Sequence, residues 1–350
     1  MTTLTLPARL EPDASLRPVP WRRMAWVIWR QHRIALGGLA AFLGALAIYV
    51  WIVGLKLHHA YVAATTCNPA SPGCADLITN FNFMNHFLQG GYVLQPVPAL
   101  IGAFVGAPVL ARELETGTFR YAWTQGFGRW RWALAKLVAL AVVVTAAAGV
   151  LGVLFSWYYQ PYFAATGHPA LELSGASPFS SALFDLRGVS FAAWTLAAFA
   201  IGALAGMLIR RVVPAIVATL AAYTGLALVG ANVLRQHYLT PLLSRNPNVP
   251  GSAWIFSQYW TRGGRFAFTS WRDAPPSLIH ACAGAPPGPL GKPPVQSFTS
   301  CAAQHGYTQL TSYQPAGRLW PFQWIEGGWL FALSVVLIAV TVWLVHRKAA

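Results

Sequence analysis

The chain has 350 residues, of which 56% are hydrophobic and only 9% are charged. Soluble domains carry about 25% charged residues, so the composition excludes a soluble protein and predicts an integral membrane protein. The net charge of +15 would suit a nucleic-acid-binding protein, but the distribution of the basic residues, described below, argues against that class.

The N-terminal 33 residues are predicted to be a cytoplasmic tail that ends in an amphipathic helix. Residues 1–19 are polar and contain prolines. In residues 21–33 an apolar stripe recurs at helical spacing opposite four arginines, which favours a helix lying in the membrane interface. The alternative is that this segment is only the polar start of the first span. The stripe consists of Trp21, Met24, Ala25, Ile28 and Trp29, and the arginines are Arg22, Arg23, Arg30 and Arg33.

Six uncharged apolar runs follow, each long enough to cross a bilayer core of about 30 Å as a helix. Pro96, Pro98 and Pro108 interrupt the second run, where we expect kinks. Only Arg210 and Arg211 separate the fourth run from the fifth, which predicts a tight helical hairpin. Residues 34–350 are therefore expected to form one all-α, six-helix transmembrane domain. The runs are 34–55, 93–111, 137–159, 189–209, 212–234 and 327–345.

The basic residues predict the orientation of these helices. With the N-terminus inside, the inner segments hold 15 Lys and Arg in 65 residues, and the outer segments hold 9 in 158. Basic residues favour the cytoplasmic side, so we expect both termini in the cytoplasm of a multi-pass cell-membrane protein embedded in the lipid bilayer. This bias accounts for the net charge, so we expect no nucleic-acid partner. The inner segments are 1–33, 112–136, 210–211 and 346–350; the outer ones are 56–92, 160–188 and 235–326.

The four cysteines all fall in outer segments. Thiols on an oxidising face favour disulfides, most simply Cys67–Cys74 and Cys282–Cys301 within their own loops. Free or metal-binding thiols are the alternative, although no spacing matches a zinc site. The longest outer segment, 235–326, is aromatic at its beginning and end, and we expect these side chains to pack on the outer membrane face. They are Trp254, Phe256, Tyr259, Trp260, Trp320, Phe322 and Trp324.

The polar loop from Arg112 to Lys136 carries both charge signs densely. Gly117 and Gly126 bracket the residues from Thr118 to Gln125. Glycine commonly ends a helix and threonine commonly caps the start of one, so the pattern predicts a short helix between two longer ones.

The same loop resembles the permease subunits of ABC-2-type ATP-binding-cassette exporters, over about 25 of the 350 residues. The Glu-x-Glu-x-Gly-Thr portion is typical of the family, and Trp-Thr-Gln followed by Arg-x-Arg-Trp looks like its actinobacterial members. The resemblance implies that the short helix is a coupling helix that docks on a cytoplasmic ATPase subunit. The matching residues are Glu113, Glu115, Gly117, Thr118, Trp123, Thr124, Gln125, Arg129, Arg131, Trp132 and Lys136.

The resemblance further implies a dimer of permease subunits, identical or not, with two ATPase subunits that hold ATP and Mg. This chain is then expected to carry no cofactor, no metal and no catalytic residue of its own. The residues expected to couple to the ATPase are Glu113, Glu115, Gly117, Thr118, Phe119, Arg120, Trp123 and Arg129.

The chain lacks the sequence features of a transporter that supplies its own driving energy. The six runs contain no Asp, Glu, Lys, Arg or His, whereas ion-coupled transporters usually place an ionisable group near the membrane midplane. The sequence most similar to a phosphate-binding loop is Gly291-Lys292, but Pro293 follows it where Ser or Thr is required. The driving energy is therefore expected to come from a partner chain.

Two other functions stay open. One is an integral membrane enzyme with an outer-face site; the other is a membrane sensor or scaffold without transport. Candidate residues for the enzyme are His58, His59, His86, Glu172, Asp185, His237, His280 and His305. Glu113 and Glu115 oppose the dipole of the helix that they end, which suggests either a functional role or an ion pair that holds the loop, with Arg120, Arg129 or Arg131.

Overall fold

The computed structural model describes residues 21–68, 71–88, 94–117, 129–165, 177–245, 249–250, 252–282 and 295–348. It is mostly helical, and among these residues six helices are long and apolar enough to cross a membrane. Each overlaps one predicted run, so the helical membrane class and the six spans are confirmed. The spans are Leu36–Thr66, Pro96–Thr116, Trp130–Ala165, Gly188–Ile209, Val212–His237 and Ala316–Arg347.

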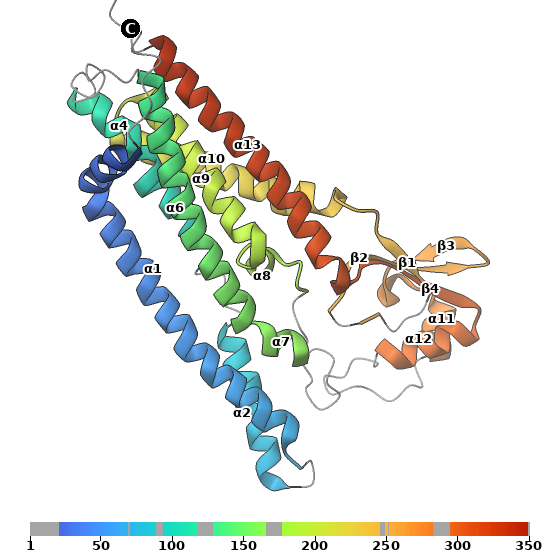
Figure 1. The fold of residues 1–350 in the computed structure, drawn as a ribbon. Coiled ribbons are helices and arrows are strands. Elements are labelled where there is room, and N and C mark those ends of the chain that lie inside the picture. The colour runs from blue at the N-terminus through green and yellow to red at the C-terminus, as the bar shows by residue number, and fades with distance from the viewer. Residues whose placement is uncertain are drawn as a thin grey trace, which may run out of the picture.

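The helices form one elongated bundle (Figure 1). At one end, here called the loop end, α1 begins, α4 ends, α6 begins and α13 ends. A small β-sheet lies at the opposite end, here called the sheet end. The helices are α1 (Trp21–Thr66), α2 (Pro72–Leu88), α3 (Pro96–Ile101), α4 (Ala107–Thr116), α6 (Arg129–Tyr158), α7 (Gln160–Ala165), α8 (Ser181–Phe184), α9 (Gly188–Ile209), α10 (Val212–Val229) and α13 (Leu319–Lys348).

The first helix differs from the prediction in its continuity. Residues from Trp21 to Thr66 form a single helix of 46 residues, so the predicted interfacial segment is not a separate helix. In Figure 1 its first turns, in dark blue, turn aside from the axis of the remaining part. Their placement in a membrane interface stays a prediction.

Two spans contain a π-helical segment. In the second span, Gly102–Gly106 joins α3 to α4, directly before Pro108, and this is where the proline-rich run is distorted. In the fifth span, Gly230–Leu234 continues α10 and leads into the 3-10 turn Arg235–His237. Such insertions shift the side chains that follow them around the helix axis.

Helix α9 is the centre of the bundle, with α13, α6, α4 and α10 packed around it. It approaches the second span closely because glycines face each other across the contact. A Cβ at Gly202 would collide with the carbonyl oxygen of Gly102, and a Cβ at Gly106 would lie 2.7 Å from the carbonyl oxygen of Phe199. The predicted α9–α10 hairpin is confirmed, because Arg210 takes a left-handed φ of 59° and α10 begins at Val212.

The segment predicted to be the longest outer one contains a four-stranded antiparallel sheet, which the sequence analysis did not predict; it is called the outer segment below. The strand order is β1-β4-β2-β3. Helices α11 (Pro276–Cys282) and α12 (Val295–Gln304) cover one face, where Trp260, Phe268 and Tyr307 form an apolar core with them. The strands are β1 (Leu242–Ser244), β2 (Trp254–Arg262), β3 (Arg265–Phe268) and β4 (Tyr307–Gln314).

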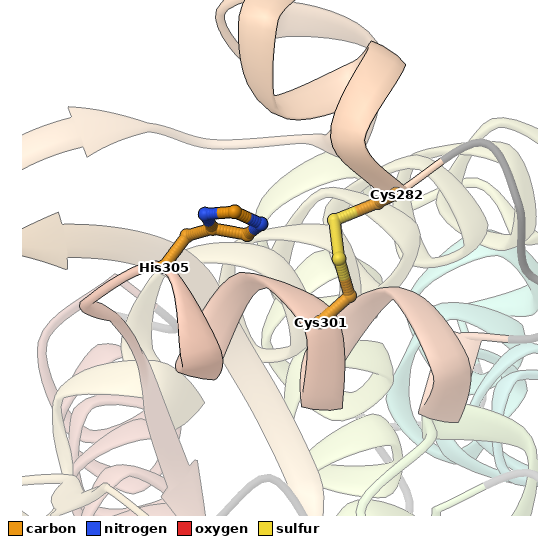
Figure 2. A group of neighbouring side chains, drawn as sticks. All are labelled: Cys282, Cys301 and His305. Carbon is orange, nitrogen blue, oxygen red and sulfur yellow. A yellow bond between two sulfur atoms is a disulfide. The ribbon is translucent and has the colours of Figure 1, made fainter.

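Both predicted disulfides are present. Cys67–Cys74 joins the end of α1 to α2, and Cys282–Cys301 joins α11 to α12, with Cα–Cα distances of 5.5 and 5.8 Å. Figure 2 shows His305 beside the second disulfide. Metal binding by cysteine needs thiolates, so the sulfurs of this disulfide are not available as ligands.

Candidate functional site

The structure describes only some of the residues that are predicted to couple to the ATPase. Gly117 ends α4 in the left-handed conformation, with φ of 70°, as predicted for a terminating glycine. The short helix predicted from Thr118 to Gln125 lies outside the described residues, with Thr118, Phe119, Arg120 and Trp123. Arg129 begins α6, but its side chain is not among those described.

Glu113 forms a buried ion pair with Lys136. Its Oε1 lies 2.6 Å from the Lys136 ammonium, which also donates to the carbonyl oxygen of Val109 at 3.0 Å. The Lys136 side chain is 1% exposed and sits 4.9 Å from the centre of the Trp132 ring. Since the partners come from α4 and α6, the pair fixes these two helices to each other at both borders of the loop.

Glu115 acts on a third helix. Its Oε2 accepts a hydrogen bond of 3.0 Å from the backbone N–H of Val212, the first residue of α10. The first N–H groups of a helix have no partner within it, and a carboxylate there also interacts favourably with the helix dipole. Glu115 therefore opposes the dipole of α4 but stabilises the start of α10.

The described residues give the two glutamates other partners than the loop arginines. Glu113 pairs with Lys136 and Glu115 binds a backbone N–H. Both interactions join elements that the sequence separates widely, so the pattern of the loop alone does not reveal them. Arg120 and the side chain of Arg129 lie outside the described residues, so an ion pair with either of them stays a prediction.

A cavity of about 1080 Å³ lies beside these charges. One wall is apolar and comes from α1, the second span and α10, and the other carries the charged residues of the loop end. An amphipathic lining of this kind suits a molecule with an apolar body and a polar end. The apolar residues are Ile34, Leu36, Phe104, Val105, Pro108, Val109, Val212 and Ile216, and the polar ones are Arg112, Glu113, Glu115, Thr116 and Lys136.

A second charged cluster is buried near the sheet end. The Arg235 guanidinium donates from Nε and Nη2 to the two carboxylate oxygens of Glu326, at 3.1 and 2.9 Å, and from Nη2 also to Asp185. Its carbon Cζ lies 4.2 Å from the centre of the Phe184 ring. The cluster joins the turn before α9, the end of the fifth span and the start of α13.

Neutral donors complete the shell of Glu326. Trp194 Nε1 donates to its Oε1 at 2.7 Å, and the Tyr238 hydroxyl donates to its Oε2 at 3.2 Å. Trp329 Nε1 in turn donates to that hydroxyl at 2.8 Å. Donors from four side chains or their relays therefore satisfy this buried carboxylate and fix its position.

Asp185 is the more exposed acid of the cluster, with 21% of its side chain exposed. Burial raises the pKa of Asp185 to about 7; the charge of Arg235 opposes this shift, and that of Glu326 adds to it. Because burial disfavours the charged carboxylate, Asp185 holds its proton to a higher pH than an exposed aspartate does.

The chain matches the sequence model of the ABC-2 membrane transporter related family over residues 40–235. The match spans more than half of the chain. The protein belongs to this family. No curated protein and no solved structure shows significant similarity to it.

Within this ABC-2 membrane protein, the match covers the first five spans and ends at Arg235. The sheet and α13 lie beyond it. Family membership and the six apolar helices make the chain a multi-pass membrane transporter permease.

The candidate catalytic residues with described side chains lie in separate places of this ABC-2 permease, whereas Glu172 and the side chain of His86 lie outside the described residues. His58 stacks on Trp157 with ring centres 4.5 Å apart, and His237 bonds the carbonyl oxygen of Val233 within its own helix at 2.6 Å. Asp185 belongs to the buried cluster and His305 lies beside the disulfide. Nothing in the described part of the chain therefore favours an outer-face enzyme.

The sequence analysis missed Arg235 and Glu326, although a signal was available. Arg235 directly follows an uncharged apolar run and Glu326 directly precedes one. Ionisable groups at such borders are costly unless they pair with each other, so opposite charges at the same membrane side are candidates for a buried pair.

Proposed function

We propose that this chain is the membrane-spanning permease subunit of an ATP-driven exporter in the cell membrane. In this proposal the loop end lies in the cytoplasm, as the distribution of basic residues favours, and a separate ATPase subunit holds ATP and Mg. A reporter fused after Ala350 is then expected in the cytoplasm, and one inserted near Gly288 outside. The opposite location of either reporter would overturn the orientation.

The observation that carries the proposal is that both glutamates at the end of α4 are attached to other spans. Glu113 binds α6 through Lys136, and Glu115 binds the start of α10. A displacement of the loop that follows Gly117 is thereby transmitted to three helices. This supports a role for the loop as the element that converts closure of the ATPase pair into a tilt of the spans.

The coupling helix itself is assigned from the sequence. A helix as short as Thr118–Gln125 is marginal in water when isolated, so it needs packing against its own loop or a partner. It carries Phe119, Tyr121 and Trp123 with Arg120, and aromatic residues beside arginines are typical of interface hot spots. We assign this surface to the ATPase.

The proposal also includes a second permease subunit, identical or not. Helices α1 and α10 border the cavity at the loop end and leave many large apolar side chains exposed. In a bilayer, lipid covers part of this surface, and a second permease subunit would close the remainder into a translocation path. The exposed residues include Ile48, Trp51, Ile52, Val213, Val217 and Leu228.

Co-purification with the ATPase tests the function. We expect Phe119→Ala with Trp123→Ala to leave the protein inserted in the membrane but to abolish co-purification and transport-stimulated ATP turnover. Trp320→Ala is the matched control, because Trp320 is an exposed aromatic residue near the opposite end of the bundle. Unchanged ATPase binding by the double variant would contradict the assignment; loss of the protein from the membrane would mean that these residues support the fold.

A further inference from the structure

The face of the outer sheet opposite to α11 and α12 packs on the bundle at its Trp254 end, and at its hairpin end no described residue covers it; it is here called the uncovered face. Cross-strand partners point to the same side, so the register places Tyr259 with Leu310, Phe266 with Thr261, and Leu243 with Ser312 on the face opposite to α11 and α12. The rings of Tyr259 and Phe266 lie 6.3 Å apart on it. Phe266 is 65% exposed and Leu243 67% exposed, whereas Trp260, Phe268 and Tyr307 on the covered face are buried.

The uncovered face is turned toward the side on which the spanning helices lie (Figure 1). Figure 1 shows α11 and α12 beyond the sheet, on the side away from α9, α10 and α13. It also shows the β2–β3 hairpin projecting sideways past the end of α13. Beyond the end of a spanning helix the neighbouring surface is the bilayer, so the exposed aromatic residues are positioned over headgroups.

The outer segment carries a net positive charge, which favours binding to an anionic surface. Residues 239–325 contain six basic residues and a single acidic one, Asp273. Arg262 and Arg265, both exposed, flank the Gly263-Gly264 turn of the hairpin, and Arg262 pairs with Tyr307 and lies 5.1 Å from the centre of its ring, on the side of α11 and α12. A second copy of this chain would bring the same positive charge against it, whereas anionic lipids attract it. The six are Arg245, Arg262, Arg265, Arg272, Lys292 and Arg318.

We propose that the uncovered sheet face rests on the anionic lipid surface of the adjacent leaflet. Phe266 and Leu243 enter the headgroup region, and the net positive charge of the outer segment holds this face against the anionic lipid. Aromatic residues prefer this depth of the bilayer because one part of it is apolar and another is wet. The inference needs only that the sheet lies at the membrane surface, so it does not depend on an ATPase partner or on the direction of transport.

The aromatic prediction from sequence is thereby refined. Trp254 and Phe322 pack with Phe179 inside the protein, and Trp260 is buried under α11 and α12. Tyr259 lies on the uncovered face, together with Phe266, which the sequence analysis did not name.

Fluorescence quenching in vesicles tests the contact with lipid. The full-length protein carries Phe266→Cys, with Ser277→Cys on α11 as the matched control; both positions are exposed, and the described native cysteines are all in disulfides. Each introduced thiol receives the same fluorophore, and a spin label on the lipid headgroup quenches it. In phosphatidylcholine vesicles with phosphatidylglycerol, we expect several-fold stronger quenching at position 266 than at 277. The excess should shrink with added salt and in Arg262→Gln with Arg265→Gln.

Three outcomes would overturn the proposal. The first is equal quenching at both positions. The second is quenching at position 266 that is the same with and without phosphatidylglycerol, because the anionic surface would then play no part. The third is efficient cross-linking of two copies through Cys at position 266, which would assign this face to a second permease subunit.

Discussion

Glu326 accepts hydrogen bonds from Nε and Nη2 of Arg235, at 3.1 and 2.9 Å, although 91 residues separate the two in the sequence and neither side chain is more than 1% exposed. The pair closes the sheet end of the bundle, because it ties the end of the fifth span to the start of α13. Gln314 and Arg318 extend this connection by donating to the carbonyl oxygens of Leu239 and Thr240, both at 2.8 Å.

The first prediction concerns the stability of this cluster. Arg235→Met leaves two buried carboxylates without their cation, and removing one partner of a buried pair typically costs about 3–5 kcal/mol. We expect a loss of this size in the free energy of unfolding in detergent. Arg245→Met is the matched control, since Arg245 is exposed and lies only ten residues further along the chain. A loss no larger than that of the control would show that the cluster does not hold the bundle.

The second prediction concerns pH. The pKa of Asp185 is about 7 in the folded protein, well above that of an aspartate in an unfolded chain, because the site is buried and Glu326 is near. The folded state therefore binds a proton that the unfolded state has lost, and stability falls as the pH rises through the interval between the two pKa values, up to about 7.

Asp185→Asn isolates this contribution, because asparagine mimics the protonated acid. We expect the melting temperatures of the variant and the wild type to be close at pH 5, with the variant more stable at pH 8. A difference that stays constant with pH would mean that Asp185 does not titrate in this interval.

The third prediction concerns the pair of Glu113 and Lys136. Lys136→Met or Glu113→Gln alone leaves a buried charge, and each should destabilise the protein by about 3 kcal/mol. The double variant should lose less than the sum of both, with an interaction energy of about 0.5–3 kcal/mol in a double-mutant cycle. Strictly additive losses would show that the 2.6 Å contact contributes no coupling.

The features that were predictable from sequence depend on local properties. The six spans follow from the length of the apolar runs and the absence of charge in them. The disulfides follow from the position of all four cysteines in segments predicted to lie outside the cell. The end of α4 at Gly117 follows from a backbone conformation that glycine adopts without strain. None of these requires knowledge of which helices are neighbours.

The contacts of the two glutamates were not predictable in the same way, because their partners are defined by packing. Lys136 lies 23 residues from Glu113, and Val212 lies 97 residues from Glu115. The loop arginines were closer in sequence and were therefore chosen as partners. The sheet was missed for a different reason: an extra residue at Phe256 interrupts the alternation in β2, and another at Ala267 interrupts it in β3, and this alternation is the signal for a half-buried strand.

The close approach of the second and fourth spans also had a sequence signal. Gly102 and Gly106, and again Gly202 and Gly206, are spaced as in Gly-x-x-x-Gly, a pattern that lets membrane helices pack backbone against backbone. Neither motif entered the sequence analysis, which used the length, the charge and the prolines of these runs but not their glycines.

The last prediction tests this contact. A Cβ at Gly202 would collide with the carbonyl oxygen of Gly102 and lie 2.8 Å from the backbone nitrogen of Ala107. All of these atoms belong to backbone, so the two helices must separate to accept alanine, and overpacking of this kind costs about 1–3 kcal/mol. Gly225→Ala is the matched control in α10, where nothing lies within 4 Å of the added carbon.

Both substitutions gain the same helix propensity, about 1 kcal/mol, so the difference between them reports the contact alone. We expect Gly202→Ala to melt at a lower temperature than the wild type in detergent, and Gly225→Ala at an equal or higher one. Because α9 also contacts α6, α10 and α13, separation at Gly202 should loosen the whole bundle and not only one helix pair. Equal stability of the two variants would mean that the second and fourth spans tolerate a wider separation than the glycine contact implies.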